Sequence, residues 1–87
     1  MRLIIRPSAN KDVKKLPKEI KQEVETIVLR MIESERLNDL KNIKKLKGHG
    51  NAYRIRIKDY RLGFFLEEDT IILSRILHRK EVYRYFP

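Results

Sequence analysis

The sequence predicts an α+β fold in which an N-terminal strand and a helical hairpin pack on one face of a small antiparallel β-sheet. Two observations support this prediction. Apolar residues recur at helical spacing in the first part of the chain, and from Tyr53 onward they alternate with polar residues. The 87 residues suffice for one hydrophobic core, so residues 1–87 are expected to form a single domain. Helices that precede such a sheet are expected to cover one of its faces.

The first elements are short. Residues 2–6 favour a strand, which Pro7 ends. Ser8 is a favourable N-cap for the helix that follows, whose apolar residues recur at spacings of four and three: Ala9, Val13 and Leu16.

A longer helix comes next. Pro17 stops the first helix and suits the first position of the second. An apolar stripe at helical spacing then predicts an amphipathic helix of about five turns that ends near Arg36; its members are Ile20, Val24, Ile27, Val28, Met31 and Ile32. In residues 38–52, the apolar Leu40, Ile43 and Leu46 favour a further short helical turn before a loop at residues 47–51, which contains two glycines.

The period of two from Tyr53 onward predicts three antiparallel strands over residues 53–57, 60–66 and 71–77. A two-residue turn at Lys58-Asp59 would pair Ile55 with Leu62 and Tyr53 with Phe64 on the core face. On the other face, Arg56 would pair with Arg61, and Arg54 with Gly63.

A second turn at residues 67–70 extends this map. It pairs Gly63 with Ser74 and Arg61 with Ile76, and it puts His78 beside Asp59, on the arginine surface. Arg75 would then lie on the core face opposite Leu62, which a bulge or an edge position would explain.

Arginines that face one another across a ladder weaken a sheet. Arg54, Arg56 and Arg61 on one surface are therefore better explained by an anionic ligand than by stability alone. Gly63 between them removes a side chain, so that a ligand backbone can approach closely.

Composition narrows the function classes. The net charge is +9, of which residues 1–37 carry +3 (nine Lys/Arg, six Asp/Glu) and residues 38–87 carry +6 (twelve Lys/Arg, six Asp/Glu). This balance favours a polyanionic partner. There is no cysteine, and two distant histidines do not predict a metal site, so we expect no metal and no cofactor. Without a long apolar run or a signal segment, a cytoplasmic protein with no membrane partner is expected.

Three segments, in this order, resemble the RelE branch of the RelE/ParE toxin superfamily, and the likeness covers essentially the whole chain. They are Leu46-Lys47-Gly48, Tyr53-Arg54-Ile55-Arg56-Ile57-Lys58-Asp59-Tyr60-Arg61 and His78-Arg79-Lys80-Glu81-Val82-Tyr83. The resemblance implies a RelE-like domain and a toxin of a type II toxin–antitoxin system. It also implies a metal-independent endoribonuclease that cleaves mRNA on the ribosome by attack of a ribose 2′-hydroxyl on the adjacent phosphate. The implied partners are a cognate antitoxin, the ribosome and mRNA, with a monomeric free toxin that forms a hetero-oligomer with its antitoxin.

The resemblance also assigns roles to residues. Arg54, Arg56 and Lys58 correspond to substrate-binding positions, and Arg61 to the clamp on the transition state. Arg79 matches the residue that assists the leaving oxygen, and Tyr83 matches the residue that activates the attacking hydroxyl. An arginine stays protonated and is a poor general base, so the base is Tyr83 or, as the alternative, His78, which titrates near neutrality. Relatives often carry lysine at the positions of Arg54 and Arg56, and glycine at that of Leu77.

Two other functions compete with a nuclease. A ParE-like toxin would inhibit DNA gyrase and cut nothing, although the set formed by Arg61, His78, Arg79 and Tyr83 favours the nuclease. A catalytically inactive module that binds RNA or the ribosome is the other alternative; the sequence has no helix-turn-helix signature for DNA.

Overall fold

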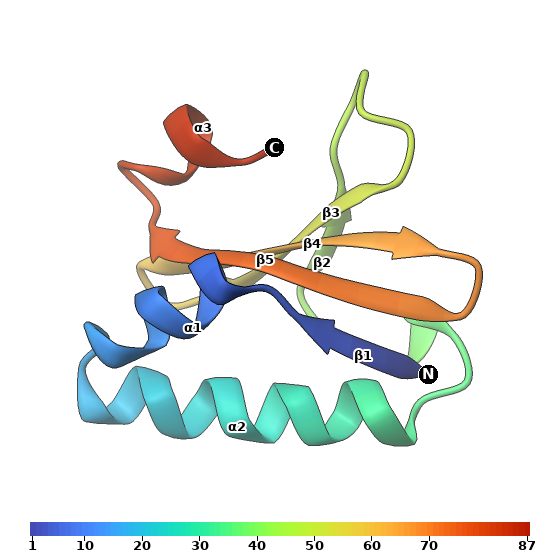
Figure 1. The fold of residues 1–87 in the computed structure, drawn as a ribbon, viewed down its shortest axis with the longest axis horizontal. Coiled ribbons are helices and arrows are strands. Elements are labelled where there is room, and N and C mark those ends of the chain that lie inside the picture. Colours follow the sequence, from blue (N-terminus) through green and yellow to red (C-terminus); the bar gives the residue numbers. More distant parts are fainter.

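The computed structural model describes residues 1–87 and has an α+β architecture (Figure 1). In chain order its elements are β1 (Arg2–Ile5), α1 (Pro7–Lys14), α2 (Lys18–Glu33), the 3₁₀ helix η1 (Leu37–Asp39), β2 (Ile43–Lys45), β3 (Ala52–Ile57), β4 (Tyr60–Glu67), β5 (Thr70–His78) and α3 (Val82–Tyr85). No helix is both long and apolar enough to cross a membrane.

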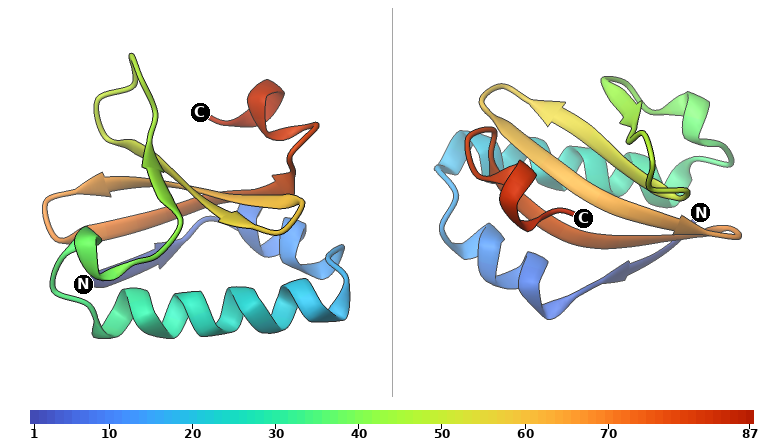
Figure 2. Two further views of the ribbon diagram at one scale, coloured as in Figure 1. Left: turned by 180° about the vertical axis from the view of Figure 1, so that it is seen from behind. Right: turned by 90° about the horizontal axis from the view of Figure 1, so that it is seen from above.

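One five-stranded sheet has the order β1-β5-β4-β3-β2. The pairs formed by β2 to β5 are antiparallel, whereas β1 runs parallel to β5 at the edge of the sheet. Helices α1 and α2 lie on one side of the sheet and α3 lies on the other (Figures 1 and 2). The predicted fold class is confirmed, but the N-terminal strand, which was predicted to pack on one face of the sheet, is an edge strand of the sheet instead, and β2 adds a fifth strand.

The main core fills the space between α2 and the sheet. Phe64, Leu62 and Met31 are fully buried there, and the ring of Tyr53 stacks on Phe64 with 5.4 Å between centroids. Aromatic and aliphatic burial of this kind is the main stabilising term of a small domain. The other buried members of this core are Ala9, Leu16, Ile20, Val24, Leu40, Ile55, Ile57, Ile71, Leu73 and Ile76.

The helix ends differ from the predicted ones by a few residues. Pro7 is the first residue of α1 and Arg6 is its N-cap, so the prediction of Ser8 as N-cap is wrong. Pro17 precedes α2 as its N-cap and is not its first residue. Helix α2 ends at Glu33, three residues before the predicted end at Arg36, and Ser34 caps it in an extended conformation.

The short helical turn predicted around Ile43 is wrong, because β2 occupies this position. Ile43 pairs with Ile55, Lys44 with Arg54 and Lys45 with Tyr53. Apolar residues three apart suit a helical turn, but the free edge of β3 offers hydrogen bonds to an extended chain, and those tertiary contacts decide the conformation. The predicted loop at residues 47–51 is confirmed and connects β2 to β3.

The first hairpin has the predicted register. Arg56 pairs with Arg61, Arg54 with Gly63, and Tyr53 with Phe64. The turn at Lys58-Asp59 is tight, with Lys58 at a φ of +53°.

The second hairpin contains a β-bulge. Phe64 pairs with Leu73 as predicted, but Gly63 pairs with Arg75, so that Ser74 is an extra residue in β5. The predicted pairs of Gly63 with Ser74, and of Arg61 with Ile76, are therefore wrong by one residue. A bulge reverses the side-chain alternation of the strand beyond it. Arg75 consequently leaves the core face, and Ile76 enters the core opposite Leu62.

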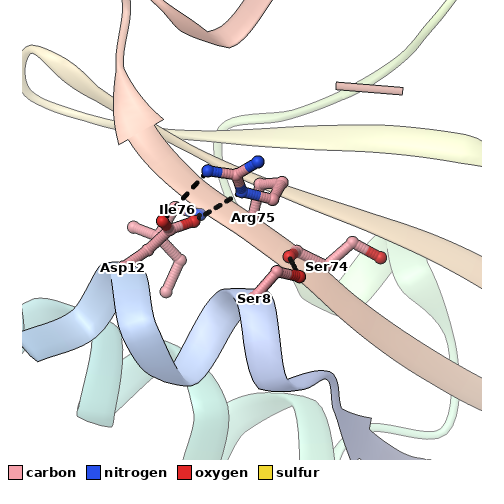
Figure 3. A network of polar contacts seen from close by, with 5 residues as sticks. All are labelled: Ser8, Asp12, Ser74, Arg75 and Ile76. Atoms are coloured by element: carbon pink, nitrogen blue, oxygen red, sulfur yellow. Dashed lines mark hydrogen bonds and ion pairs between the residues drawn. The ribbon is translucent and has the colours of Figure 1, made fainter. Parts of the chain in front are cut away.

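Helix α1 holds the bulge through polar side chains (Figure 3). The Ser8 hydroxyl donates a hydrogen bond of 2.7 Å to the Ser74 carbonyl. The Asp12 carboxylate, which is buried, accepts from the backbone N–H of Ile76 at 2.9 Å and from Arg75 at 2.8 and 3.2 Å. This hydrogen bonding to Asp12 raises the pKa of Arg75.

Replacing Asp12 should therefore destabilise the whole domain. In Asp12→Ala the buried Ile76 N–H and the Arg75 guanidinium both lose their acceptor, and we expect the free energy of unfolding to fall by about 2–4 kcal/mol. Urea denaturation followed by circular dichroism measures this loss. Lys58→Ala removes an exposed ion pair with Glu19 and is the control that should stay close to wild type. An equal loss in both variants would contradict the role of Asp12.

Candidate functional site

The sheet face that α1 and α2 leave uncovered carries a cluster of arginines. Arg54 and Arg56 point outward from β3, and Arg61 points outward from β4 opposite Arg56. Lys44 of β2 adds a fourth positive charge beside Arg54. We call Arg54, Arg56 and Arg61 with Lys44 the basic cluster. The sequence-based prediction that the three arginines share one surface is confirmed.

Backbone carbonyls position Arg61 within this cluster. Its Nη1 donates to the carbonyl oxygens of Lys58 at 2.8 Å and of Tyr60 at 2.9 Å. Partial burial lowers the pKa of Arg61, and the charges of Arg54, Arg56 and Arg79 lower it further. The environment therefore disfavours positive charge in the free protein, and a bound anion would relieve this repulsion.

Tyr83 of α3 lies at the border of the basic cluster. The guanidinium carbon of Arg54 is 4.8 Å from the centroid of the Tyr83 ring, while the side chain as a whole is 77% exposed. The Arg54 guanidinium beside the ring lowers the pKa of the Tyr83 phenol, and the charges of Lys44 and Arg61 add to this effect. A lowered pKa brings a phenol closer to use as a general base.

Arg79 is close enough to the basic cluster to influence it electrostatically, as its effect on the pKa of Arg61 indicates. Its backbone N–H donates to the Asp59 carbonyl at 2.7 Å, which fixes the start of the tail. Its Nε is 3.8 Å from the Asp59 carboxylate, and the side chain is 58% exposed. This ion pair is long, so the guanidinium remains accessible to another anion.

Two predicted site residues lie elsewhere. His78 pairs with Tyr60, and its ring meets the Tyr60 ring edge-on with 5.4 Å between centroids. It shares a hollow with Asp12 and Leu16, on the side of the sheet that α1 covers. The prediction that His78 shares a surface with the arginines is therefore wrong, because the bulge at Ser74 turns it to the other face.

Lys58 also lies outside the basic cluster. Its ammonium is 3.2 Å from Glu19 and 3.8 Å from Glu23, both in α2. These hydrogen bonds and charges raise the pKa of Lys58. Its charge is thus already offset by two carboxylates, and it extends toward the helices.

The sequence suggested that Gly63 leaves open space for a ligand backbone, and this prediction is wrong. A Cβ atom built on Gly63 would lie 2.5 Å from the ring of Phe86, which fills the space above the glycine. Phe86 and Val82 are buried against Ala52 in a second, smaller core on this face of the sheet. Phe86 is thus a packing residue.

Besides a hollow next to α2 that Arg56 shares with Glu23, two hollows adjoin the basic cluster. One, of about 340 Å³, is lined by Asn42, Ile43, Lys44, Arg54, Arg56 and Arg61. The other, of about 510 Å³, lies between the β2–β3 loop and the tail and is lined by Lys44, Leu46, Lys47, His49, Arg54, Tyr83, Phe86 and Pro87. No acidic residue lines either hollow, so both suit a phosphate-bearing ligand.

Lys44 belongs to both hollows, and the sequence analysis missed it. The signal for Lys44 is the strand Ile43-Lys44-Lys45, in which Ile43 faces the core and Lys44 faces outward. No group of three or more His, Cys, Asp or Glu side chains lies in an arrangement that could hold a metal ion.

Comparison with known proteins gives concordant results. The family described as ParE toxin of type II toxin-antitoxin system, parDE, matches residues 3–83. Toxin RelE3 of Methanocaldococcus jannaschii is 44% identical over 88 aligned positions that cover 100% of both chains.

Two solved structures extend this comparison. The toxin in the RelB-RelE antitoxin-toxin complex from Methanococcus jannaschii has a TM-score of 0.84 at 44% identity, covering 97% of this chain and 99% of that chain. The archaeal RelE-RelB complex from Pyrococcus horikoshii OT3 has a TM-score of 0.71 at 25% identity, covering 90% and 93% respectively.

The contact between Arg54 and Tyr83 predicts a measurable change in titration. In Arg54→Ala the Tyr83 pKa should rise toward the ordinary value for tyrosine, since the main cause of its lowering is gone. A pH titration of ¹³C-labelled tyrosine by NMR, assigned with Tyr83→Phe, measures it. Arg56→Ala removes an equal charge without a contact to the ring, so it should change the Tyr83 pKa far less. A similar shift in both variants would contradict the contact.

Proposed function

This chain belongs to the RelE/ParE family of toxins of type II toxin–antitoxin systems, and on that premise we propose that it is a ribosome-dependent endoribonuclease that cleaves mRNA. One arrangement carries the proposal. A tyrosine with a lowered pKa, Tyr83, lies against Arg54 at the border of a cluster of arginines on the sheet face opposite α1 and α2. A base beside phosphate-binding groups is the combination that RNA cleavage without a metal requires.

In the proposed reaction, Tyr83 removes the proton of a ribose 2′-hydroxyl. The 2′ oxygen then bonds to the adjacent phosphorus, and the bond from phosphorus to the 5′ oxygen of the next nucleotide breaks. The products are a 2′,3′-cyclic phosphate and a 5′-hydroxyl, whose oxygen takes a proton from water as it leaves. Arg61 and Arg54 stabilise the added negative charge of the transition state, and Arg79 assists the leaving oxygen.

The shape of the site supports a need for the ribosome. The two hollows are open to solvent, and aromatic rings available for stacking on a base are few. Phe65, which shares this face of the sheet, is covered by Phe86, with 5.1 Å between ring centroids, and by Arg6 at 5.7 Å. Tyr83 is therefore the exposed ring nearest the basic cluster. Free single-stranded RNA would bind weakly, so the ribosome would have to hold the substrate in place.

An antitoxin is the expected protein partner. The similar toxins from Methanococcus jannaschii and Pyrococcus horikoshii were each solved in complex with RelB. We propose that this chain likewise binds a cognate antitoxin. An acidic segment of that antitoxin would neutralise the basic cluster, in keeping with the net charge of +9. On this view the free toxin is a monomer and the silent form is a hetero-oligomer.

The second candidate is a ParE-like toxin that inhibits DNA gyrase and has no nuclease activity. The observation that favours it is the matched family itself, whose description names parDE. The pairing of Arg54 with Tyr83 favours the nuclease, because an inhibitor that only binds has no use for a tyrosine of lowered pKa.

Cleavage should require Tyr83 and should not require His78. In a cell-free translation reaction with mRNA ends mapped by primer extension, Tyr83→Phe should slow cleavage at least about 100-fold, because it removes the base but keeps the ring. Arg61→Ala should slow cleavage by about 100- to 1000-fold. His78→Ala and Lys58→Ala should cleave at nearly the wild-type rate.

The opposite result is equally informative. If His78→Ala abolishes cleavage and Tyr83→Phe does not, the base is misassigned. If the folded wild-type protein leaves mRNA intact but blocks gyrase supercoiling, the second candidate is correct.

The rate of cleavage should increase with pH, as expected for a reaction that needs a deprotonated base. Since Tyr83 acts when deprotonated, the single-turnover rate on programmed ribosomes should increase with pH up to the Tyr83 pKa. Arg54→Ala should move this increase to higher pH, because it removes the main cause of the lowered pKa. A profile that does not move, in a variant whose Tyr83 pKa has risen by NMR, would exclude Tyr83 as the base.

A further inference from the structure

The position of Tyr83 depends on how α3 is held. Helix α3 has four residues, Val82–Tyr85, and an isolated helix of this length is not stable in water. Two of the tail side chains, Val82 and Phe86, are four residues apart and both are buried. They pack in the small second core against Ala52, with Leu46, Phe65 and Leu77 around them. This core is what keeps the tail on the sheet.

Phe86 is bound in a space of its own shape. Gly63 is buried beneath it, and the three nearest atoms to a Cβ built on Gly63 all belong to the Phe86 ring, at 2.5 to 2.8 Å. We call this space above Gly63 the Gly63 notch. No other residue type at position 63 would allow the ring to lie so close to the backbone of β4.

Tyr83 has little else to hold it. It follows Val82 in the chain but lies on another side of α3. It is 77% exposed, and its ring contacts the Arg54 guanidinium. A cation–π contact at an exposed site is weak, too weak to order a tail that is otherwise free. The placement of the phenol is therefore set by the packing of Val82 and Phe86 below it.

We propose that Phe86, bound in the Gly63 notch, is a positioning residue for Tyr83: it holds α3 on the sheet and thereby holds the phenol beside Arg54. The effect of Phe86 on cleavage rests on the proposed function. Its effect on the placement of Tyr83 rests only on the geometry of the notch. Phe86 itself touches Gly63 and Phe65; it lines the larger hollow beside Tyr83, but not the hollow formed by the three arginines. It acts on the reaction through Tyr83.

The second core is separate from the main one, and this makes the inference testable. The main core lies between α2 and the sheet and contains neither Val82 nor Phe86. Loss of the Phe86 ring should release α3 while the sheet and α2 remain folded. Circular dichroism and the urea midpoint report on that remaining fold.

The test uses two variants that empty the notch by opposite means. Phe86→Ala removes the ring, and Gly63→Ala puts a methyl group where the ring lies. Tyr85→Ala is the control in the same tail, since Tyr85 is half exposed and lies against Arg75 outside the notch. Phe86→Leu is the conservative variant, which keeps an apolar group in the notch.

Two readouts are needed. The first is the Tyr83 pKa by ¹³C-tyrosine NMR in the free protein, which requires no activity. The second is cleavage of mRNA on ribosomes, with the rate constant and the concentration dependence measured separately. We expect Phe86→Ala and Gly63→Ala to restore an ordinary Tyr83 pKa and to reduce the rate constant by at least about 10-fold, since small misplacement of a reacting group is costly. The concentration that gives half of the maximal cleavage rate should change less, because the basic cluster is intact.

A double variant sharpens the test. If Gly63→Ala acts by expelling the ring, then adding it to Phe86→Ala should cause little further loss, so the two effects should not add. Tyr85→Ala should match wild type in both readouts, and Phe86→Leu should recover part of the rate and of the pKa shift.

Two results would overturn the inference. In one, Phe86→Ala cleaves slowly while the Tyr83 pKa stays as in wild type. In the other, Phe86→Ala leaves both readouts unchanged. Failure of the proposed function looks different: no protein cleaves, wild type included, while the Tyr83 pKa still responds to Phe86→Ala and Gly63→Ala.

Discussion

The extra residue at Ser74 in β5 is the constraint on which most of this structure depends. Strand β1 pairs with β5 only as far as Leu73. Beyond it α1 contacts β5: the Ser8 hydroxyl donates to the Ser74 carbonyl, and the Asp12 carboxylate accepts from the Ile76 N–H. These bonds satisfy backbone groups of β5 beyond the end of its pairing with β1, which an apolar contact would not do. The bulge then reverses the alternation of every later residue in β5.

That reversal determines what lies on each side of the sheet. His78 turns toward the helices beside Tyr60, whereas Leu77 turns to the other face and joins the second core. The chain therefore leaves β5 where it can fold back over the uncovered face, and α3 brings Tyr83 to the basic cluster. The site consequently depends on the hydrogen bonds that Ser8 and Asp12 of α1 make with β5 (Figure 3), although α1 contributes no residue to the basic cluster.

Repulsion among the side chains of the basic cluster destabilises the fold, which is better explained by an anionic ligand than by stability. Arg56 and Arg61 face one another across a ladder, and neighbouring arginines lower the pKa of Arg61. Lys58, by contrast, has two glutamates beside it and Arg75 has Asp12. Cations with a structural role are thus paired in this protein, while those of the cluster lack close carboxylates. Repulsion of this kind destabilises the protein, and a bound polyanion would relieve it.

The sequence by itself determined the helical pair, the three long strands, the first hairpin register and the common surface of Arg54, Arg56 and Arg61, because local periodicity and a two-residue turn fix these features. It did not determine β2, the bulge, the face of His78 or the occupant of the Gly63 notch. Each of these depends on residues far apart in the chain: Ser8 and Ser74 are 66 positions apart, and Asp12 and Ile76 are 64. A pattern within one strand carries no information about a partner on another element, so only the tertiary structure decided which residues meet Tyr83.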